Sequence, residues 1–220
     1  MSGHSPPRVA SIGAALGGVG LTHHFTRKRE ERAAAAKQAS ERLYIATELV
    51  FLLEQFAEGS TLVAADSGEQ DKDGITVPTE TQPDIELTLV KGDWQVLPAK
   101  LIYRIRELPM LRAEAGKYVA SAYENSWPPD YSPTFQERQY QYSRLGLKAL
   151  FAAIRLLEVA GLPSTRLNAT SWSAQPELWR VWRQARGRLS VLVRQQQTLA
   201  QMNVALQQSI KNNSQSGRTP

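Results

Sequence analysis

The side chains that most often carry acid–base and metal chemistry are confined to the front of this chain. All three histidines, His4, His23 and His24, precede residue 27, and none of the 220 residues is cysteine. The remainder therefore has no imidazole for a general base or a zinc site, and no thiolate nucleophile or ligand. The GxGxxG, GxxxxGKS/T and GxSxG motifs are also missing. We predict a protein that is not an enzyme and uses no cofactor; a hydrolase built from Asp, Glu, Lys or Tyr is the remaining catalytic alternative.

One acidic stretch approaches the spacing of a calcium-binding loop. The residues that match positions 1, 3, 5, 6 and 12 of that pattern are Glu69, Asp71, Asp73, Gly74 and Glu80. Position 1 carries Glu instead of the shorter Asp, Pro78 follows the turn, and no helix pattern begins after Glu80. A solvated acidic loop explains the same residues, so no metal is predicted and calcium is the weaker alternative.

A stretch rich in tryptophan and arginine lies near the end of the chain. Its members are Trp179, Arg180, Trp182, Arg183, Arg186 and Arg188. On a helix Trp182, Ala185, Leu189 and Leu192 fall on one side, and Arg180, Arg183, Arg188 and Arg194 fall on the other. This arrangement leaves three hypotheses. The tryptophans pack into a bundle while the arginines are solvated, or the helix lies on a membrane surface, or the arginines bind nucleic acid.

Basic residues are concentrated at both ends of the chain, whose net charge is +5. Residues 1–32 have five basic and two acidic side chains, and residues 177–220 have seven basic and one acidic. The segment between them is net acidic. Basic ends suit anionic lipid and nucleic-acid phosphate equally well.

An uncharged stretch at residues 9–26 stands before the basic cluster Arg27, Lys28 and Arg29. Eighteen helical residues span about 27 Å, close to the hydrocarbon thickness of a bilayer. Gly13 and Gly17 form a GxxxG pair, which lets membrane helices approach closely. These features predict a single-pass membrane anchor with the body of the protein on the cytoplasmic side. A soluble leader is the alternative.

The apolar periodicity of the remaining chain predicts an all-α helical bundle. Helices are expected at residues 27–65, 98–108, 110–125, 132–160 and 176–210, with Pro109 closing the second. Residues 66–83 form an acidic loop, 85–90 a short extended piece, and 211–220 a disordered tail. The predicted divisions are a leader at 1–26, a stalk and core at 27–162, a linker with a basic amphipathic helix at 163–210, and the tail.

A heptad row runs along the last predicted helix. Leu178, Ala185, Leu192, Leu199 and Leu206 recur every seven residues. Trp182, Leu189 and Ile210 occupy the positions between them, and Gln196 and Asn203 interrupt that second row. The pattern predicts a helix that packs along a partner, either within the chain or in another chain.

Four stretches of the chain have a distinctive sequence: Asp93–Trp94, residues 101–109, residues 128–131 and residues 135–149, whose Glu-Arg-Gln-Tyr-Gln-Tyr run is the most specific part. Together they resemble a group of uncharacterised bacterial proteins that begin with a Gly-rich apolar anchor and a basic stalk. The resemblance covers about residues 12–162 and implies membrane attachment without an assigned activity. It draws attention to Glu137, Arg138, Tyr140 and Tyr142, either as a structural network or as a site for a ligand or partner.

These observations together predict a non-catalytic interaction or scaffold protein anchored in the bacterial inner membrane. The GxxxG pair and the heptad row both favour self-association. The alternative is a soluble cytoplasmic protein that binds nucleic acid through its basic C-terminal helix.

Overall fold

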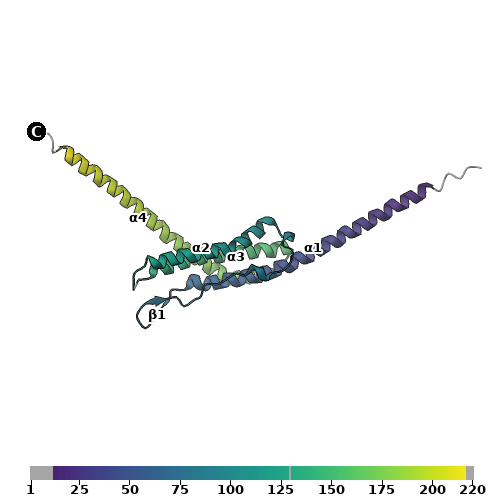
Figure 1. Cartoon of the computed structure of the whole chain (residues 1–220), viewed down its shortest axis with the longest axis horizontal. Helices are drawn as coiled ribbons and strands as arrows, with labels where there is room; N and C mark the ends of the chain where they lie inside the picture. Colours follow the sequence, from purple (N-terminus) through teal and green to yellow (C-terminus); the bar gives the residue numbers. More distant parts are fainter. Residues whose placement is uncertain (1–11, 129, 217–220) are drawn as a thin grey trace, which may run out of the picture.

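The computed structural model describes the backbone of residues 12–128 and 130–216, and the side chains of residues 24, 26–128 and 130–208. Within these residues the chain forms α1 (Ile12–Ala65), α2 (Ala99–Glu124), α3 (Ser132–Ala160) and α4 (Ala174–Ser216). Strands β1 (Glu69–Gln70) and β2 (Thr76–Val77) make one short antiparallel hairpin. Three 3-10 turns lie at Leu87–Leu89, Trp94–Val96 and Arg166–Asn168. The predicted all-α class is confirmed (Figure 1).

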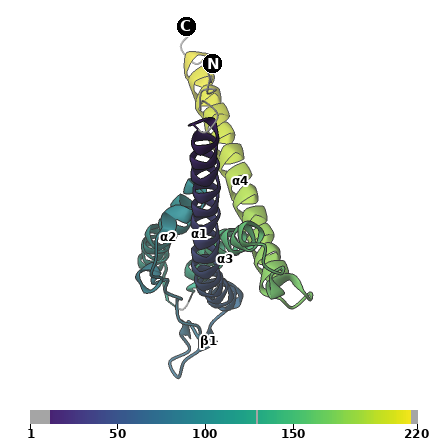
Figure 2. The same ribbon diagram turned by 90° about the vertical axis from the view of Figure 1, so that its right-hand side faces the viewer.

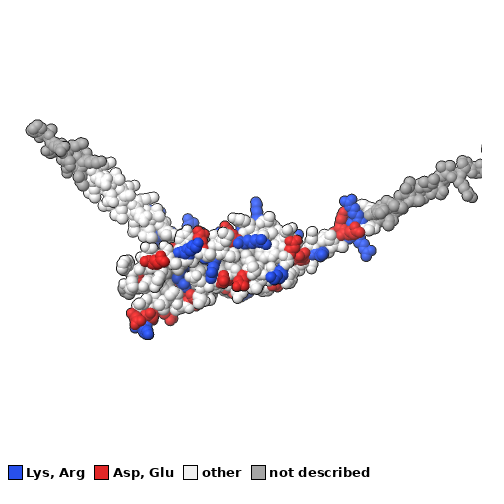
Figure 3. Space-filling view, in the orientation of Figure 1, with Lys and Arg blue, Asp and Glu red and all other residues white. Residues whose placement is uncertain are grey.

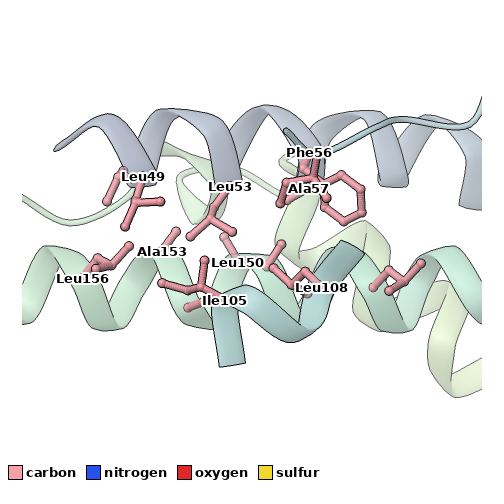
Figure 4. Close-up of a cluster of buried hydrophobic side chains, with 14 of the residues drawn as sticks. Leu49, Leu53, Phe56, Ala57, Ile105, Leu108, Leu150, Ala153 and Leu156 are labelled. Carbon is pink, nitrogen blue, oxygen red and sulfur yellow. The ribbon is translucent and has the colours of Figure 1, made fainter. Parts of the chain in front are cut away.

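The body of the protein forms where the second half of α1, α2, α3 and the start of α4 pack together. α3 lies at the centre, because it contacts α1, α2 and α4. Figure 4 shows the core between them, in which Leu49, Leu53 and Phe56 of α1 meet side chains of α2 and α3. Their neighbours include Ile105, Leu108, Leu150, Ala153 and Leu156. Each large buried side chain contributes about 1.5–3 kcal/mol of hydrophobic stabilisation.

The helix predicted at residues 27–65 is confirmed as part of α1, whose two apolar faces enter the core from residue 45 onward. Ala46, Val50, Leu53 and Ala57 are buried, as are Ile45, Leu49 and Phe56 of the neighbouring face. Residues 26–43, whose side chains the structure describes, are exposed or half-buried. The predicted stalk is thus the part of α1 that precedes the body.

The predicted helix break at Pro109 is wrong, because α2 runs through this residue. Ile105, Leu108 and Ala115, on both sides of the proline, are buried in the same core. Continuing the helix keeps these side chains on one face, and this burial offsets the backbone hydrogen bond that proline cannot make. Residues 85–90 also differ from the prediction, since they contain a 3-10 turn at Leu87–Leu89.

Two helical arms leave the body. The front of α1 and the end of α4 extend from opposite ends of the body and rise toward the same side (Figures 1 and 2). Residues 26–40 of α1 and 189–208 of α4 are exposed along their whole length. We call residues 189–208 the α4 arm. α4 continues past the predicted end at Ile210 to Ser216, and residues 217–220 lie outside the described part of the chain.

No helix in the described residues combines the length and the apolarity needed to cross a bilayer. The structure therefore gives no support to the predicted transmembrane helix. Four of the 18 residues at positions 9–26 are glycine and two are histidine, which dilutes the apolar character of the segment. Gly13 and Gly17 lie in α1, and their surroundings fall outside the described side chains.

Candidate interaction surface

The two tryptophans of the Trp/Arg stretch lie half-buried where α4 meets α3. The ring of Trp179 stands edge-on to Phe151 of α3, with ring centres 6.0 Å apart, and edge-on to Trp182 at 5.1 Å. Both rings pack against the core. Aromatic pairs in this geometry add to the stabilisation from buried area, so the tryptophans hold the start of α4 on the body.

The arginines of the same stretch have partners within the chain. Arg180 pairs with Glu177 and donates to Gln184 at 3.1 Å, and its hydrogen bond holds the pKa of the Glu177 carboxyl below the usual range. Arg183 and Arg186 lie over Trp179 and Trp182, at 5.6 and 5.0 Å from the ring centres. Arg188 donates to Gln139 of α3 at 3.1 Å. A phosphate ligand would have to compete with these contacts.

The α4 arm exposes a run of large apolar side chains beyond these contacts. They are Leu189, Val191, Leu192, Val193, Leu199, Met202, Val204 and Leu206, each between 42% and 59% exposed. Leu178 and Ala185, which belong to the same heptad row as Leu192, Leu199 and Leu206, are buried against the body. The same apolar row is therefore covered by the body at Leu178 and Ala185 and exposed to solvent from Leu192 onward.

Charged side chains are sparse on the α4 arm. Arg194 is the one charged residue in the sequence from 189 to 208. The visible face of the arm is correspondingly white in Figure 3, whereas the body and the stalk of α1 carry both signs of charge. An exposed helix normally presents charged residues to water, so the arm has the composition of a surface that another helix covers.

The side chains of Glu137, Arg138, Tyr140 and Tyr142 in α3 lie in different surroundings. Arg138 is buried and donates to the carboxylate of Asp66 at 3.0 Å and to the carbonyl of Glu80 at 2.8 Å. Tyr142 is fully buried one turn further on. Glu137 and Tyr140 are half-buried on another face, where Glu137 accepts from Gln141 and the Tyr140 ring lies under Arg144. The structure therefore joins Arg138 to Asp66 and does not unite the four residues in one site.

The Asp66–Arg138 pair fixes the acidic loop to α3. Asp66 also accepts hydrogen bonds from the backbone of Gly68 at 2.8 Å and from the Thr79 hydroxyl at 2.9 Å. Burial raises the pKa of Asp66, but these bonds, the backbone N–H of Glu80 and the Arg138 charge outweigh it and hold that pKa below its ordinary value. The pair is a structural clamp that closes the loop.

Asp71 of the calcium-like pattern stabilises the hairpin turn. One carboxylate oxygen of Asp71 accepts the backbone N–H groups of Asp73 and Ile75, both at 2.9 Å. Gly74 has φ of +76°, which the turn requires. Among the described side chains, no group of three or more His, Asp or Glu residues comes close enough to hold a metal ion. Glu69, Asp71, Asp73 and Glu80 thus form no ligand set here.

No protein-family model, curated protein or solved structure matches this chain. The resemblance to uncharacterised bacterial proteins stays a prediction. The function is therefore inferred from the residues and the geometry of the chain itself.

Two further features of the body, the contacts of the linker before α4 and a hollow between α2 and α3, had no signal in the sequence. Glu54 of α1 is buried and accepts from Thr165, while Arg166 reaches Glu58 at 3.0 Å, so the linker before α4 is tied to α1. A hollow of about 650 Å³ between α2 and α3 gathers Lys100, Arg104, Lys148 and Arg155. All four of these side chains are exposed, so the hollow has no desolvated charge of the kind that fixes a ligand. Both features bring together residues that are far apart in the sequence, which a single sequence does not reveal.

Proposed function

We propose that this chain is a non-catalytic scaffold protein that binds other protein chains through its α4 arm. The supporting observation is the exposed apolar row of the arm. Apolar side chains spaced three, four and seven residues apart on a helix are the usual recognition elements for a groove or for another helix. Eight exposed large apolar side chains on one protruding helix are unusual in a monomer and typical of an interaction site.

The use of the buried polar residues also supports a non-catalytic role. The Asp66–Arg138 pair closes the acidic loop, and Glu54 with Thr165 fastens the linker. Each of these groups is engaged by a neighbour within the chain. Buried ionised groups that join elements in this way have a structural use, and such ion pairs shift pKa values without a catalytic role.

A photo-cross-linking amino acid placed in the arm of the full chain tests the proposal in cells. At position 199, within the apolar row, we expect adducts of defined mass with a protein. At position 201, on the opposite side of the arm, we expect few or none, so that variant is the matched control. The proposal is refuted if position 199 yields no adduct, or if both positions yield the same adducts to the same extent.

Attachment to a membrane through residues 9–26 is a separate part of the proposal. It is supported by the uncharged stretch and the basic cluster behind it. Extraction of cell membranes with carbonate and then with detergent is the test. Retention of the chain until detergent is added supports an anchor, and recovery in the soluble fraction excludes one.

The alternative function is nucleic-acid binding through the basic residues of α4. The excess of basic over acidic side chains in residues 177–220 favours it, and the intramolecular contacts of Arg180, Arg183 and Arg186 oppose it. Filter binding at two salt concentrations distinguishes the cases, because phosphate contacts are strongest at low salt. No retention of labelled DNA or RNA at low salt excludes this function.

A further inference from the structure

We infer that the α4 arm pairs with the α4 arm of a second copy of this chain as an antiparallel two-stranded coiled coil. The inference rests on the proposed function and specifies the partner. The heptad row supplies one core position with Leu192, Leu199 and Leu206, and the second row supplies the other with Leu189, Gln196 and Asn203. Leucine in the first row is typical of two-stranded coiled coils, and amides in the second row, here Gln196 and Asn203, specify the register and the partner number at a cost in stability.

The charges of the arm favour a second copy over a different partner. The positions that flank the core of a coiled coil usually carry Glu and Lys, which select the partner by charge. In the arm these positions hold Val193, Gln195, Ala200, Met202 and Gln207, and Arg194 lies on the outer side. Two copies of such a neutral surface meet without repulsion, and these positions carry no charges that would select a partner of opposite charge.

The length of the arm is sufficient for a stable pair. Twenty helical residues extend about 30 Å. Two helices packed along this length bury on the order of 1,200 Å² in total, which is the lower range of specific protein interfaces. The exposed apolar side chains of the arm provide this area without rearrangement of the body.

The body determines the direction of the partner. Leu178 and Ala185 begin the same row and are covered by α3 and α1, so the row faces the side on which the body lies, within a drift of about 20° per heptad. A parallel partner would run along that side into the volume that the body occupies. An antiparallel partner ends there instead, with its own body at the far end of the arm.

The end of α4 sets the register. The helix continues to Ser216, and the body covers α4 as far as Ala185, with Arg188 half-buried. If Leu206 lies opposite Gln196 of the second copy, Ser216 falls opposite Arg186 and clears most of the body. Leu199 then lies opposite Asn203. The two Asn203 residues are one turn apart along the axis, about 6 Å, so their amides are within reach of each other.

Sedimentation equilibrium of the full chain measures the pairing. We expect a species of twice the 24.5 kDa chain mass. The double variant Leu199→Asp with Leu206→Asp should weaken association by about 100-fold or more, because it places charges in the apolar seam. Gln201→Asp with Gln208→Asp adds the same charge on the outer side and should leave the mass unchanged. A monomer at all concentrations, or equal behaviour of the two variants, overturns the inference.

Cysteine cross-linking measures the direction, since the natural chain has no cysteine. A mixture of Gln196→Cys and Leu206→Cys chains should form a disulfide-linked pair on oxidation. Neither variant alone should do so, because equivalent residues then lie about 15 Å apart along the axis. A disulfide between two Leu206→Cys chains would show a parallel pair and refute the antiparallel arrangement. A monomer that still cross-links another protein from position 199 would refute self-pairing and leave the proposed function intact.

Discussion

At the scale of single residues, Asp66 and Arg138 form a buried ion pair between the acidic loop and α3. The side chains of both residues are almost fully buried, with 1% and 6% exposed. The sequence draws attention to Arg138 through a local run of residues, but its partner Asp66 lies 72 positions earlier, at the start of the predicted acidic loop. A contact between residues so distant in sequence depends on how α1 and α3 are packed, and nothing in the local pattern reports it.

Asp66→Asn should destabilise the body strongly. The amide keeps the shape of the side chain but leaves the Arg138 charge buried without its counter-ion. Breaking a buried pair in this way costs about 3–5 kcal/mol. Urea unfolding followed by tryptophan fluorescence measures the loss. Asp71→Asn, in the hairpin turn, is the control and should cost less than half as much.

The same pair predicts a dependence of stability on pH. Because the pKa of Asp66 is lower in the folded protein than its ordinary value of 3.8, the folded state favours the ionised carboxylate. Its contribution is complete above that ordinary value and is lost as the pH falls toward the lowered pKa. The free energy of unfolding should therefore drop below about pH 4 in the natural chain. This component should be absent in the Asp66→Asn variant; an equal drop in both would contradict the assignment.

Removing the Tyr142 hydroxyl should not lower the free energy of unfolding, in contrast to Asp66→Asn. Its ring is fully buried, burial raises its pKa, and its hydroxyl has no hydrogen-bond partner among the described residues. Tyr142→Phe removes the unsatisfied group and retains the ring. We expect the free energy of unfolding to stay the same or to rise by up to about 1 kcal/mol. A loss of more than that amount would show that the hydroxyl has a stabilising partner.

At the scale of elements, the long periodic segments were predictable and their interruptions were not. The helices at 27–65, 132–160 and 176–210 followed from apolar spacing, and all three are present. The heptad row also identified the surface of the arm, although it left open whether the partner lies within the chain. Pro109 misled the prediction because a local rule about proline competes with burial on both sides of it, and the burial is visible only in three dimensions.

Pro109→Ala is expected to stabilise α2. Alanine supplies the backbone N–H that the helix lacks at this position, and an interior proline costs a helix about 3 kcal/mol. The gain is reduced because alanine is more flexible than proline in the unfolded chain. We expect an increase of about 1–2 kcal/mol in the free energy of unfolding. A decrease would indicate that the ring of Pro109 is itself needed for packing.

At the scale of the whole molecule, the sequence indicated a helical body with extensions at both ends, as observed. It could not indicate that the arms rise toward the same side, because this direction follows from the angles at which α1 and α4 cross α3 (Figure 2). The predicted membrane anchor was inferred from the absence of charged residues in positions 9–26. The glycines and histidines of this stretch lower its hydropathy, which a count of charges does not detect.

Substitutions in the α4 arm should not change the stability of the body. No described side chain from 189 to 208 is buried, so substitutions there remove no core contact. At concentrations where association is negligible, Leu199→Asp with Leu206→Asp should unfold within about 0.5 kcal/mol of the natural chain. Thermal and urea unfolding provide the comparison. A larger loss would mean that the arm folds back on the body.

α1 is one uninterrupted helix from Ile12 to Ala65, and its second half carries Leu49, Leu53 and Phe56 into the core. A rod of 54 residues is about 80 Å long. Such a rod works as a lever whose fulcrum is the edge of the body. A sideways force on its free end produces a torque on the packed half, so whatever holds the front of α1 can load the core mechanically without touching it.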